Sequence, residues 1–168
     1  EPIVQLRNDK MISANEHGHF VFQKQLVSGK EFKPAGKFVV HPDYPSVNLS
    51  DTGEGLLILP GENDNLIVCA TPADALAIKS LPAYHKDTVV VIGNNPTEST
   101  AASLHKLVEN GRGMKVLAEN LTMVGQRLAF WIKLQFSHLA KLHLPDGCSH
   151  WLEAHRLLAQ EKAPAKPA

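Results

Sequence analysis

The chain has 168 residues, of which 43% are hydrophobic and 20% are charged, with 17 basic and 17 acidic residues. This length supports one well-cored domain, or one domain with a small appendage, and the composition is that of an ordinary soluble globular protein. The net charge of zero excludes a global field that attracts nucleic acid, so any such contact must come from a local patch.

Cysteine usage and hydropathy indicate a reducing compartment and no membrane partner. Cys69 and Cys148 are too few for a disulfide framework, so we expect the cytoplasm. No apolar run approaches the roughly 20 residues that cross a bilayer. The N-terminus has no basic segment followed by an apolar stretch, and therefore does not resemble a signal peptide. The sequence does not begin with Met, which fits a piece of a longer protein or a processed chain.

Residues 1–60 predict a small β-rich subdomain. HFVFQKQL (19–26) alternates apolar and polar residues, as an antiparallel strand with one solvated face does. SGK (28–30) and PAGK (34–37) have the composition of turns. KFVVHP (37–42) and GLLILP (55–60) predict two further strands, each ended by a proline.

Residues 61–160 predict an α/β domain, because strand patterns alternate with helix patterns. The predicted strands cover 66–70, 88–92, 114–119 and 141–144. The predicted helices cover 73–81, 97–110, 125–138 and 151–160. Thr71 is the expected N-cap of the first helix, with Pro72 at its first position. Residues 161–168 predict a flexible tail.

Three stretches of this second region carry a resemblance to a known family. They are IVCATPADAL (67–76), VLAENLTMVGQRLA (116–129) and LPDGCSHWLEAHR (144–156). In this order and spacing they resemble the Toprim domain of primases and topoisomerases, and in particular the primase-like domains of phages and conjugative plasmids. The family pattern has a strand ending in Glu-Gly with Asp four residues after the Glu. A strand ending in Asp-x-Asp before Gly-Gln-Arg-x-Ala follows, and then a Leu-Pro-x-Gly-Lys-Asp turn.

The chain departs from that pattern at its acidic positions. Ala70 stands where the family has Glu, and Asn120 and Thr122 stand where it has the two Asp. In the family these carboxylates hold Mg²⁺, which requires oxygen ligands and one or two anionic ones. The resemblance therefore implies a Toprim-like parallel sheet flanked by helices, but vestigial positions in place of catalytic residues, with no bound metal and no cofactor.

A metal site built from other carboxylates is the first alternative. Asp74 matches the family's Asp after the Glu-Gly turn, and Glu98 begins a predicted helix. Glu119 could contribute only if its strand ends at or before it, because successive strand residues face opposite sides. These three residues would make the chain an active metal-dependent Toprim primase or nuclease.

Three lysines in the N-terminal region indicate a local nucleic-acid contact. Lys30, Lys33 and Lys37 cluster there, with Phe32 and Phe38 between them. Basic and aromatic side chains together bind single-stranded nucleic acid by charge and stacking, and the alternative is a solvated strand face. Arg127 is the fourth nucleic-acid candidate.

Aromatic residues on the third predicted helix are candidates for a partner surface. Phe130 and Trp131 lie beside Arg127, and at helical spacing such aromatics are otherwise core residues. The histidines and Cys148 near the C-terminus match no zinc-ligand spacing. The turn at 93–96 could bind an anion or be purely structural.

Together these observations predict a non-catalytic Toprim-like accessory domain of a DNA-processing protein, with a conjugative relaxase or a plasmid primase as the parent. Its function would be to hold single-stranded DNA or to dock a transfer or replication protein. A pure protein–protein recruitment module is the remaining alternative, and the zero net charge favours it over DNA binding.

Overall fold

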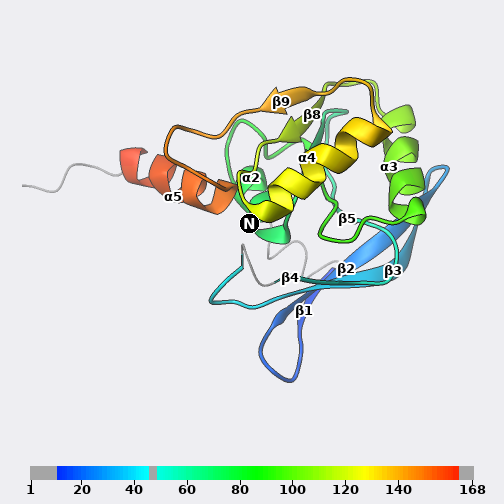
Figure 1. Cartoon of the computed structure of the whole chain (residues 1–168), viewed down its shortest axis with the longest axis horizontal. Coiled ribbons are helices and arrows are strands. Elements are labelled where there is room, and N and C mark those ends of the chain that lie inside the picture. The colour runs from blue at the N-terminus through cyan, green and yellow to red at the C-terminus, as the bar shows by residue number, and fades with distance from the viewer. Residues whose placement is uncertain (1–10, 46–48, 163–168) are drawn as a thin grey trace, which may run out of the picture.

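The computed structural model describes residues 11–45 and 49–162, and these form two β-sheets with helices packed around one of them (Figure 1). The N-terminal sheet is antiparallel, with strand order β1-β2-β3-β4. Its strands are β1 (Ile12–Ala14), β2 (Phe20–Ser28), β3 (Glu31–Val40) and β4 (Leu49–Thr52). The predicted N-terminal β-rich region is present, and the short strands β1 and β4 were not predicted.

The second sheet has strand order β5-β7-β6-β8-β9, with β5 antiparallel at one edge and the other four strands parallel. Its strands are β5 (Leu57–Leu59), β6 (Leu66–Cys69), β7 (Thr88–Val91), β8 (Lys115–Ala118) and β9 (Ala140–Leu142). The helices are α2 (Pro72–Lys79), α3 (Glu98–Asn110), α4 (Met123–Gln135) and α5 (Trp151–Lys162). The predicted α/β fold, with a parallel sheet and flanking helices, is confirmed.

Alternate residues of the central strand β6 enter two different cores, one on each face of the sheet. Ile67 and Cys69 pack in the core that includes α2, α5 and the N-terminal sheet. Leu66 and Val68 pack in the core that includes α3 and α4. A strand buried on both faces is a continuous apolar run, which is why LIVC was recognisable as a strand.

The helix starts follow local capping chemistry. Thr71 Oγ1 accepts a hydrogen bond from Asp74 N at 3.1 Å, with Pro72 in the first turn as predicted. Thr97 and Thr100 form a reciprocal capping box at the start of α3. α4 begins at Met123 because Thr122 caps it, two residues before the predicted start.

One predicted turn is wrong. PAGK (34–37) lies inside β3, where the pairing with β2 shifts register between Gln23 and Gln25. A Cβ on Gly36 would lie 2.2 Å from the carbonyl oxygen of Thr52, so the neighbouring chain fits only against a glycine. The Pro and Gly therefore mark a bulge in a strand rather than a chain reversal.

A buried ion pair joins β2 to β4 within the N-terminal sheet. The side chains of Lys24 and Asp51 are each 1% exposed, and Lys24 Nζ donates to Asp51 Oδ1 and to the carbonyl of Gly53. The other carboxylate oxygen of Asp51 accepts from Asn95 N at 3.0 Å, in the loop after β7. The N-terminal sheet therefore holds a loop at the carboxyl edge of the parallel strands.

The first two residues of the predicted tail (161–168) belong to α5, and residues 163–168 lie outside the described residues.

Across 11–45 and 49–162, no helix is both long and apolar enough to cross a membrane.

We predict that Lys24→Met lowers the free energy of unfolding by roughly 3 to 5 kcal/mol, because it leaves the buried Asp51 carboxylate without its cation. Lys86→Met, at a side chain that is 59% exposed, is the matched control and should change stability by less than about 0.5 kcal/mol. Urea unfolding measures both. In the double variant Lys24→Met/Asp51→Asn the loss should be smaller than the sum of the single losses. Equal losses in Lys24→Met and Lys86→Met would contradict a stabilising role for the pair.

Candidate functional site

The carboxyl ends of β6, β7 and β8 lie at one edge of the parallel sheet, where open α/β folds bind ligands. Ala70 follows β6 there and is fully buried. Asn120 and Thr122 follow β8, with Asn120 buried and Thr122 half-buried. The three positions at which the resemblance expects carboxylates therefore follow adjacent strands at this edge, but none of their side chains carries a charge.

Asp74 is the carboxylate buried at this edge, where it accepts hydrogen bonds from within the protein and interacts electrostatically with His150. Its Oδ2 accepts from Asn120 Nδ2 at 2.6 Å and its Oδ1 accepts from Trp151 N at 2.9 Å. The Asp74 side chain has no exposed surface. It therefore joins the first turn of α2, the loop after β8 and the start of α5.

The Asn120 side chain uses both ends of its amide. While Nδ2 donates to Asp74, Oδ1 accepts from Thr122 N at 2.9 Å and from the Thr122 hydroxyl. Thr122 in turn caps α4. Asn120 and Thr122 thus form a continuous chain of hydrogen bonds from Asp74 to α4.

Burial raises the pKa of two groups at this edge, Asp74 and Cys69. It raises the pKa of Asp74 above the usual 3.8, and the hydrogen bonds from Asn120 and Trp151 only partly offset that effect. Burial, with the nearby Asp74 carboxylate, also raises the pKa of the Cys69 thiol well above its usual range. A neutral buried thiol is a poor nucleophile, so Cys69 is a core residue, as its strand position predicts.

Glu119 lies one residue beyond the end of β8 and points to a different set of partners. Its Oε2 lies 3.1 Å from His143 Nδ1, and its Oε1 accepts from Leu144 N. The Glu119 side chain is 26% exposed. The strand does end before Glu119, but the carboxylate is directed to the segment after β9 instead of joining Asp74.

The remaining acidic candidate, Glu98, is exposed at the first position of α3. Nearer α5, Glu153 Oε1 accepts from the Ser149 hydroxyl at 2.6 Å and lies 3.0 Å from His150 Nε2. Within 11–45 and 49–162, no group of three or more His, Cys, Asp or Glu side chains is arranged so that it could hold a metal ion.

The lysines proposed for nucleic acid are exposed, but the bulge in β3 divides them. Lys37 pairs with Gln23 and Lys33 pairs with Leu26. Since positions 23 and 26 are three apart on β2, the two lysines lie on opposite faces of the sheet, although four-residue spacing in a regular strand would place them together. Lys30 lies in the turn between β2 and β3.

The aromatic residues between the lysines also differ in exposure. Phe38 is completely buried and packs in the core against α2 and α5, so it has no face for stacking. Phe32 is 49% exposed and pairs across the strands with Val27.

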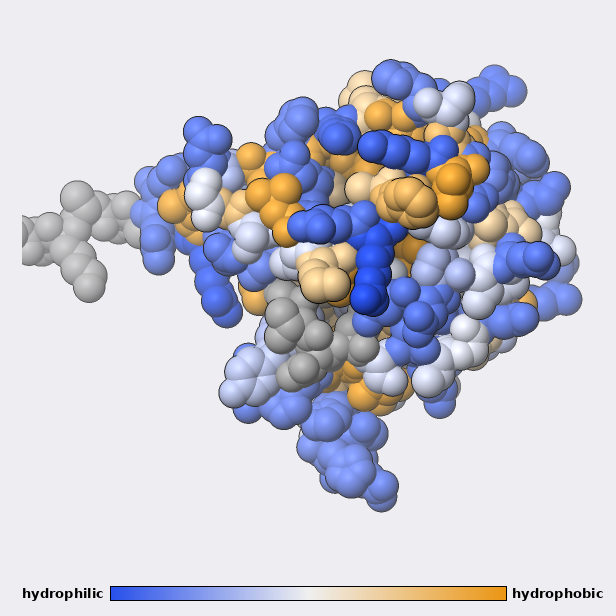
Figure 2. Space-filling view, viewed as in Figure 1, coloured by the Kyte–Doolittle hydropathy of each residue, from blue (hydrophilic) through white to orange (hydrophobic). Residues whose placement is uncertain are grey.

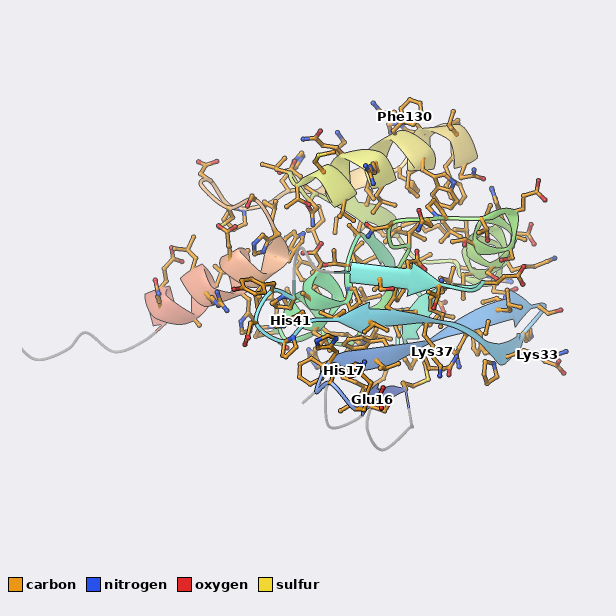
Figure 3. All side chains as sticks on the ribbon, turned by 60° about the horizontal axis from the view of Figure 1, so that its bottom comes forward. Glu16, His17, Lys33, Lys37, His41 and Phe130 are labelled. Carbon is orange, nitrogen blue, oxygen red and sulfur yellow. The ribbon has the colours of Figure 1, made fainter. Side chains whose placement is uncertain are left out.

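α4 carries an exposed apolar stripe flanked by positive charge. Met123, Phe130 and Leu134 are each more than 65% exposed and recur at helical spacing, with Arg127 between them. Figure 2 shows the apolar side chains gathered over this helix. Trp131 is half-buried against the core of α3 and α4, so Phe130 and not Trp131 is the free aromatic. In Figure 3, Phe130 lies far from Lys33 and Lys37, so Arg127 on the same helix is not part of the lysine cluster.

Two features of the structure were not predicted. Lys24 lies two residues after Phe22 on β2, so both side chains point to the buried face of the sheet. A lysine at an inward position of an alternating strand indicates that a buried partner must neutralise it. A row of four rings, His17, His19, His41 and Tyr44, also forms at one end of the N-terminal sheet. No local pattern marks it, because two separate turns bring these rings together.

No protein-family model and no curated protein matches this sequence. Among solved structures, the chain is similar to one in the bacteriophage T7 lagging-strand DNA polymerase interacting with primase domains of two gp4 subunits bound to an RNA/DNA hybrid and dTTP. That match has a TM-score of 0.50 and 13% identity, and covers 92% of this chain and 81% of the other. The RNA polymerase domain of Mycobacterium tuberculosis primase DnaG, in complex with double-stranded DNA, gives a TM-score of 0.45 and 14% identity. This match covers 94% of the present chain and 60% of the DnaG chain. The first of these matches, with its TM-score of 0.50, shows that the fold is primase-like.

We predict that Asp74→Ala lowers the free energy of unfolding by about 2 to 4 kcal/mol, because Asn120 Nδ2 and Trp151 N lose their acceptor in the core. Asp74→Asn keeps one acceptor oxygen and should lose less. The raised pKa of Asp74 means that the native state binds this proton more tightly than the unfolded state. The free energy of unfolding of the wild type should therefore exceed that of Asp74→Asn by most when the pH is below the usual pKa of Asp74. This difference should decline as the pH rises through the raised pKa of Asp74 in the native state.

Urea unfolding of wild type and Asp74→Asn at a series of pH values from about 4 to about 7 measures this decline. A wild-type advantage that grows with pH would show instead that the hydrogen bonds outweigh burial and hold the carboxylate ionised.

Proposed function

We propose that the chain is a non-catalytic, degenerate Toprim domain of a DNA-processing protein, and that it binds single-stranded DNA through its N-terminal sheet. The observation that carries the loss of catalysis is the Asp74 network. The carboxylate buried at the ligand-binding edge is satisfied by Asn120 and Trp151, and its neighbours Ala70 and Thr122 offer no charge.

The chemistry of phosphoryl transfer supports this proposal. Mg²⁺ in such sites keeps several waters and is held by one or two carboxylates, and two-metal mechanisms need more negative charge. Asp74 Oδ2 is 2.6 Å from an amide hydrogen-bond donor, so a cation there would have to displace Asn120. The partly positive NH₂ group of Asn120 repels a metal ion and attracts the Asp74 carboxylate, so this carboxylate has its hydrogen-bond donor without a metal.

The enzymatic alternative requires Glu119, Asp74 and Glu98 to act together. Asp74 is buried and hydrogen-bonded, Glu119 is directed to His143 and Leu144, and Glu98 is exposed at the start of α3. Their separate partners favour the non-catalytic proposal over an active metal-dependent primase or nuclease.

Exposed cations on the N-terminal sheet support the DNA contact. Lys30, Lys33 and Lys37 are all exposed around the β2–β3 hairpin, and no described residue forms an ion pair with them. The zero net charge means that binding depends on such local cations, and because Lys33 and Lys37 lie on opposite faces of the sheet, a strand that contacts both must pass around the β2–β3 hairpin. The similar T7 structure contains primase domains bound to an RNA/DNA hybrid, which suggests a nucleic-acid ligand for this chain as well.

The likeness to primase domains favours a primase, rather than a conjugative relaxase, as the parent protein. A relaxase or another conjugation protein rests on the sequence resemblance alone. In either parent, a domain with this edge would position a template or a displaced strand for a catalytic centre elsewhere.

Docking of a transfer or replication protein is the second candidate function, and the exposed stripe on α4 favours it. Phe130 and Leu134 are each 69% exposed, and α4 contains Arg127 and Lys133 but no acidic residue. An acidic amphipathic segment is the partner that complements such a face. The domain would then be a recruitment module, with or without DNA.

We predict that Asn120→Asp creates metal dependence that the wild type lacks. The new carboxylate lies beside Asp74 in a buried site, so repulsion between like charges should lower the melting temperature, and millimolar Mg²⁺ should restore part of the loss. Wild-type melting should not respond to Mg²⁺. Thermal unfolding with Mg²⁺ or EDTA measures both, and Gln160→Glu, which adds a carboxylate at an exposed position of α5, is the control.

Strong stabilisation of the wild type by Mg²⁺, or primer synthesis by the purified protein, would contradict the non-catalytic assignment. If such activity exists, its loss in Glu119→Gln would identify the carboxylate that the enzymatic alternative requires.

We predict that Lys33→Glu and Lys37→Glu each weaken binding of a single-stranded oligonucleotide and reduce the salt dependence of its affinity. Each lost phosphate contact removes about 0.7 from the slope of log K against log salt. Fluorescence anisotropy at several salt concentrations gives the affinity and the slope. Lys86→Glu is the control, because Lys86 is exposed in the segment before β7 and far from this sheet in sequence.

Arg127→Glu in the same assay tests the fourth candidate separately, since Arg127 lies on α4. Absence of oligonucleotide binding by wild type at low salt would exclude the DNA-binding proposal and leave docking at α4 as the better assignment.

A further inference from the structure

Four aromatic rings from two separate turns form a row at one end of the N-terminal sheet. The ring centroids are 6.0 Å apart for His17 and His19, 4.9 Å for His19 and His41, and 5.3 Å for His41 and Tyr44. His17 and His19 belong to the turn between β1 and β2, and His41 and Tyr44 follow β3. Figure 3 shows His17 and His41 close together beside the strands of this sheet.

The row is held in place by hydrogen bonds within each turn. Asn15 Oδ1 accepts from the backbone N of His17 and of His19, each at 3.0 Å, and Asn15 N donates to the carbonyl of His19 at 3.0 Å. After β3, the backbone N of Asp43 donates to His41 Nδ1 at 3.1 Å. These bonds fix the backbone of the first turn and the ring of His41, which reduces the conformational freedom that the row loses when it binds a flat ligand.

Both ends of the row face solvent. The His17 side chain is 70% exposed and Tyr44 is 58% exposed, whereas none of the four rings belongs to either hydrophobic core. Core packing therefore does not explain the row. A metal site does not explain it either, since the described parts of the chain contain no metal-binding group of His, Cys, Asp or Glu side chains.

The sheet beside the row offers a cation on the same face. β2 and β3 pair Val21 with Val39 and Gln23 with Lys37. Because side chains alternate, these positions share the outward face with His19 and His41, whereas Phe22 and Phe38 point inward. Two acidic residues lie beside the rings: Glu16 lies 3.5 Å from His17, and Asp43 flanks His41.

We propose that the row of His17, His19, His41 and Tyr44 is a stacking platform for the bases of single-stranded nucleic acid, with Lys37 contacting the adjacent phosphates. The inference rests on the proposed DNA binding and adds where the bases lie. Aromatic faces beside a cation on an exposed sheet are the means by which single strands are bound without sequence preference. The flanking Glu16 restricts the path of the backbone to the Lys37 side of the row.

The test compares two oligonucleotides of equal length, a thymidine oligomer and an abasic oligomer with the same number of phosphates. We expect the thymidine oligomer to bind roughly tenfold more tightly, because only it has bases to stack. His17→Ala and Tyr44→Leu should each weaken its binding about five- to tenfold, without changing the binding of the abasic oligomer or the salt slope. Tyr44→Phe, which keeps the ring, should retain wild-type affinity.

Equal affinity for the two oligomers would overturn the stacking platform while leaving the phosphate contacts of the proposed function intact. Tyr44→Leu binding as tightly as Tyr44→Phe would overturn it as well. If wild type binds neither oligomer at low salt, the proposed function fails together with this inference. Since His17 and Tyr44 are exposed, the variants should melt as wild type does, and circular dichroism verifies that they are folded.

Discussion

The Asp74 carboxylate is the interaction on which the carboxyl edge of the parallel sheet depends. It is fully buried, and it accepts one hydrogen bond from Asn120 after β8 and one from the first residue of α5. A buried carboxylate needs donors or a cation, and here the protein supplies the donors itself. Three elements that are far apart in sequence are thereby joined by these hydrogen bonds. The need of the buried Asp74 carboxylate for donors, which a metal ion could also meet, is met here by hydrogen bonds that stabilise the fold.

The second constraint is the buried pair of Lys24 and Asp51, which fixes the orientation of the N-terminal sheet. Because Asp51 also accepts from Asn95, the inward face of that sheet is joined to the loop after β7. On the outward face, Lys37 is exposed, and the ring row ends in the exposed His17 and Tyr44. Asp74 and the polar groups at the edge of the parallel sheet therefore form hydrogen bonds within the protein. On the N-terminal sheet, by contrast, Lys37 and the ends of the ring row are exposed to solvent.

Local patterns predicted the parts of the structure that local physics decides. The run LIVC and the caps Thr71 and Thr97 were recognisable because double-sided burial and helix capping each leave a signature within a few residues. The bulge in β3 was not, since Pro34 and Gly36 have the same composition whether the chain turns or bulges, and the close approach of Thr52 decides between them. The ring row depends on strand register across two turns, which no single segment encodes.

The Asp74 network also explains how a Toprim-like scaffold would remain stable after losing its metal. Several carboxylates at one buried edge repel one another unless a cation binds, so losing the metal alone would destabilise the domain. Asn120 removes one charge and donates to Asp74, and Thr122 removes another and caps α4. If the chain is a degenerate Toprim domain, as we propose, these replacements compensate for the lost metal, because each removes repulsion and adds a hydrogen bond. In a domain without such a metal, DNA binding would have to rely on side chains, such as the exposed Lys33 and Lys37 of the other sheet.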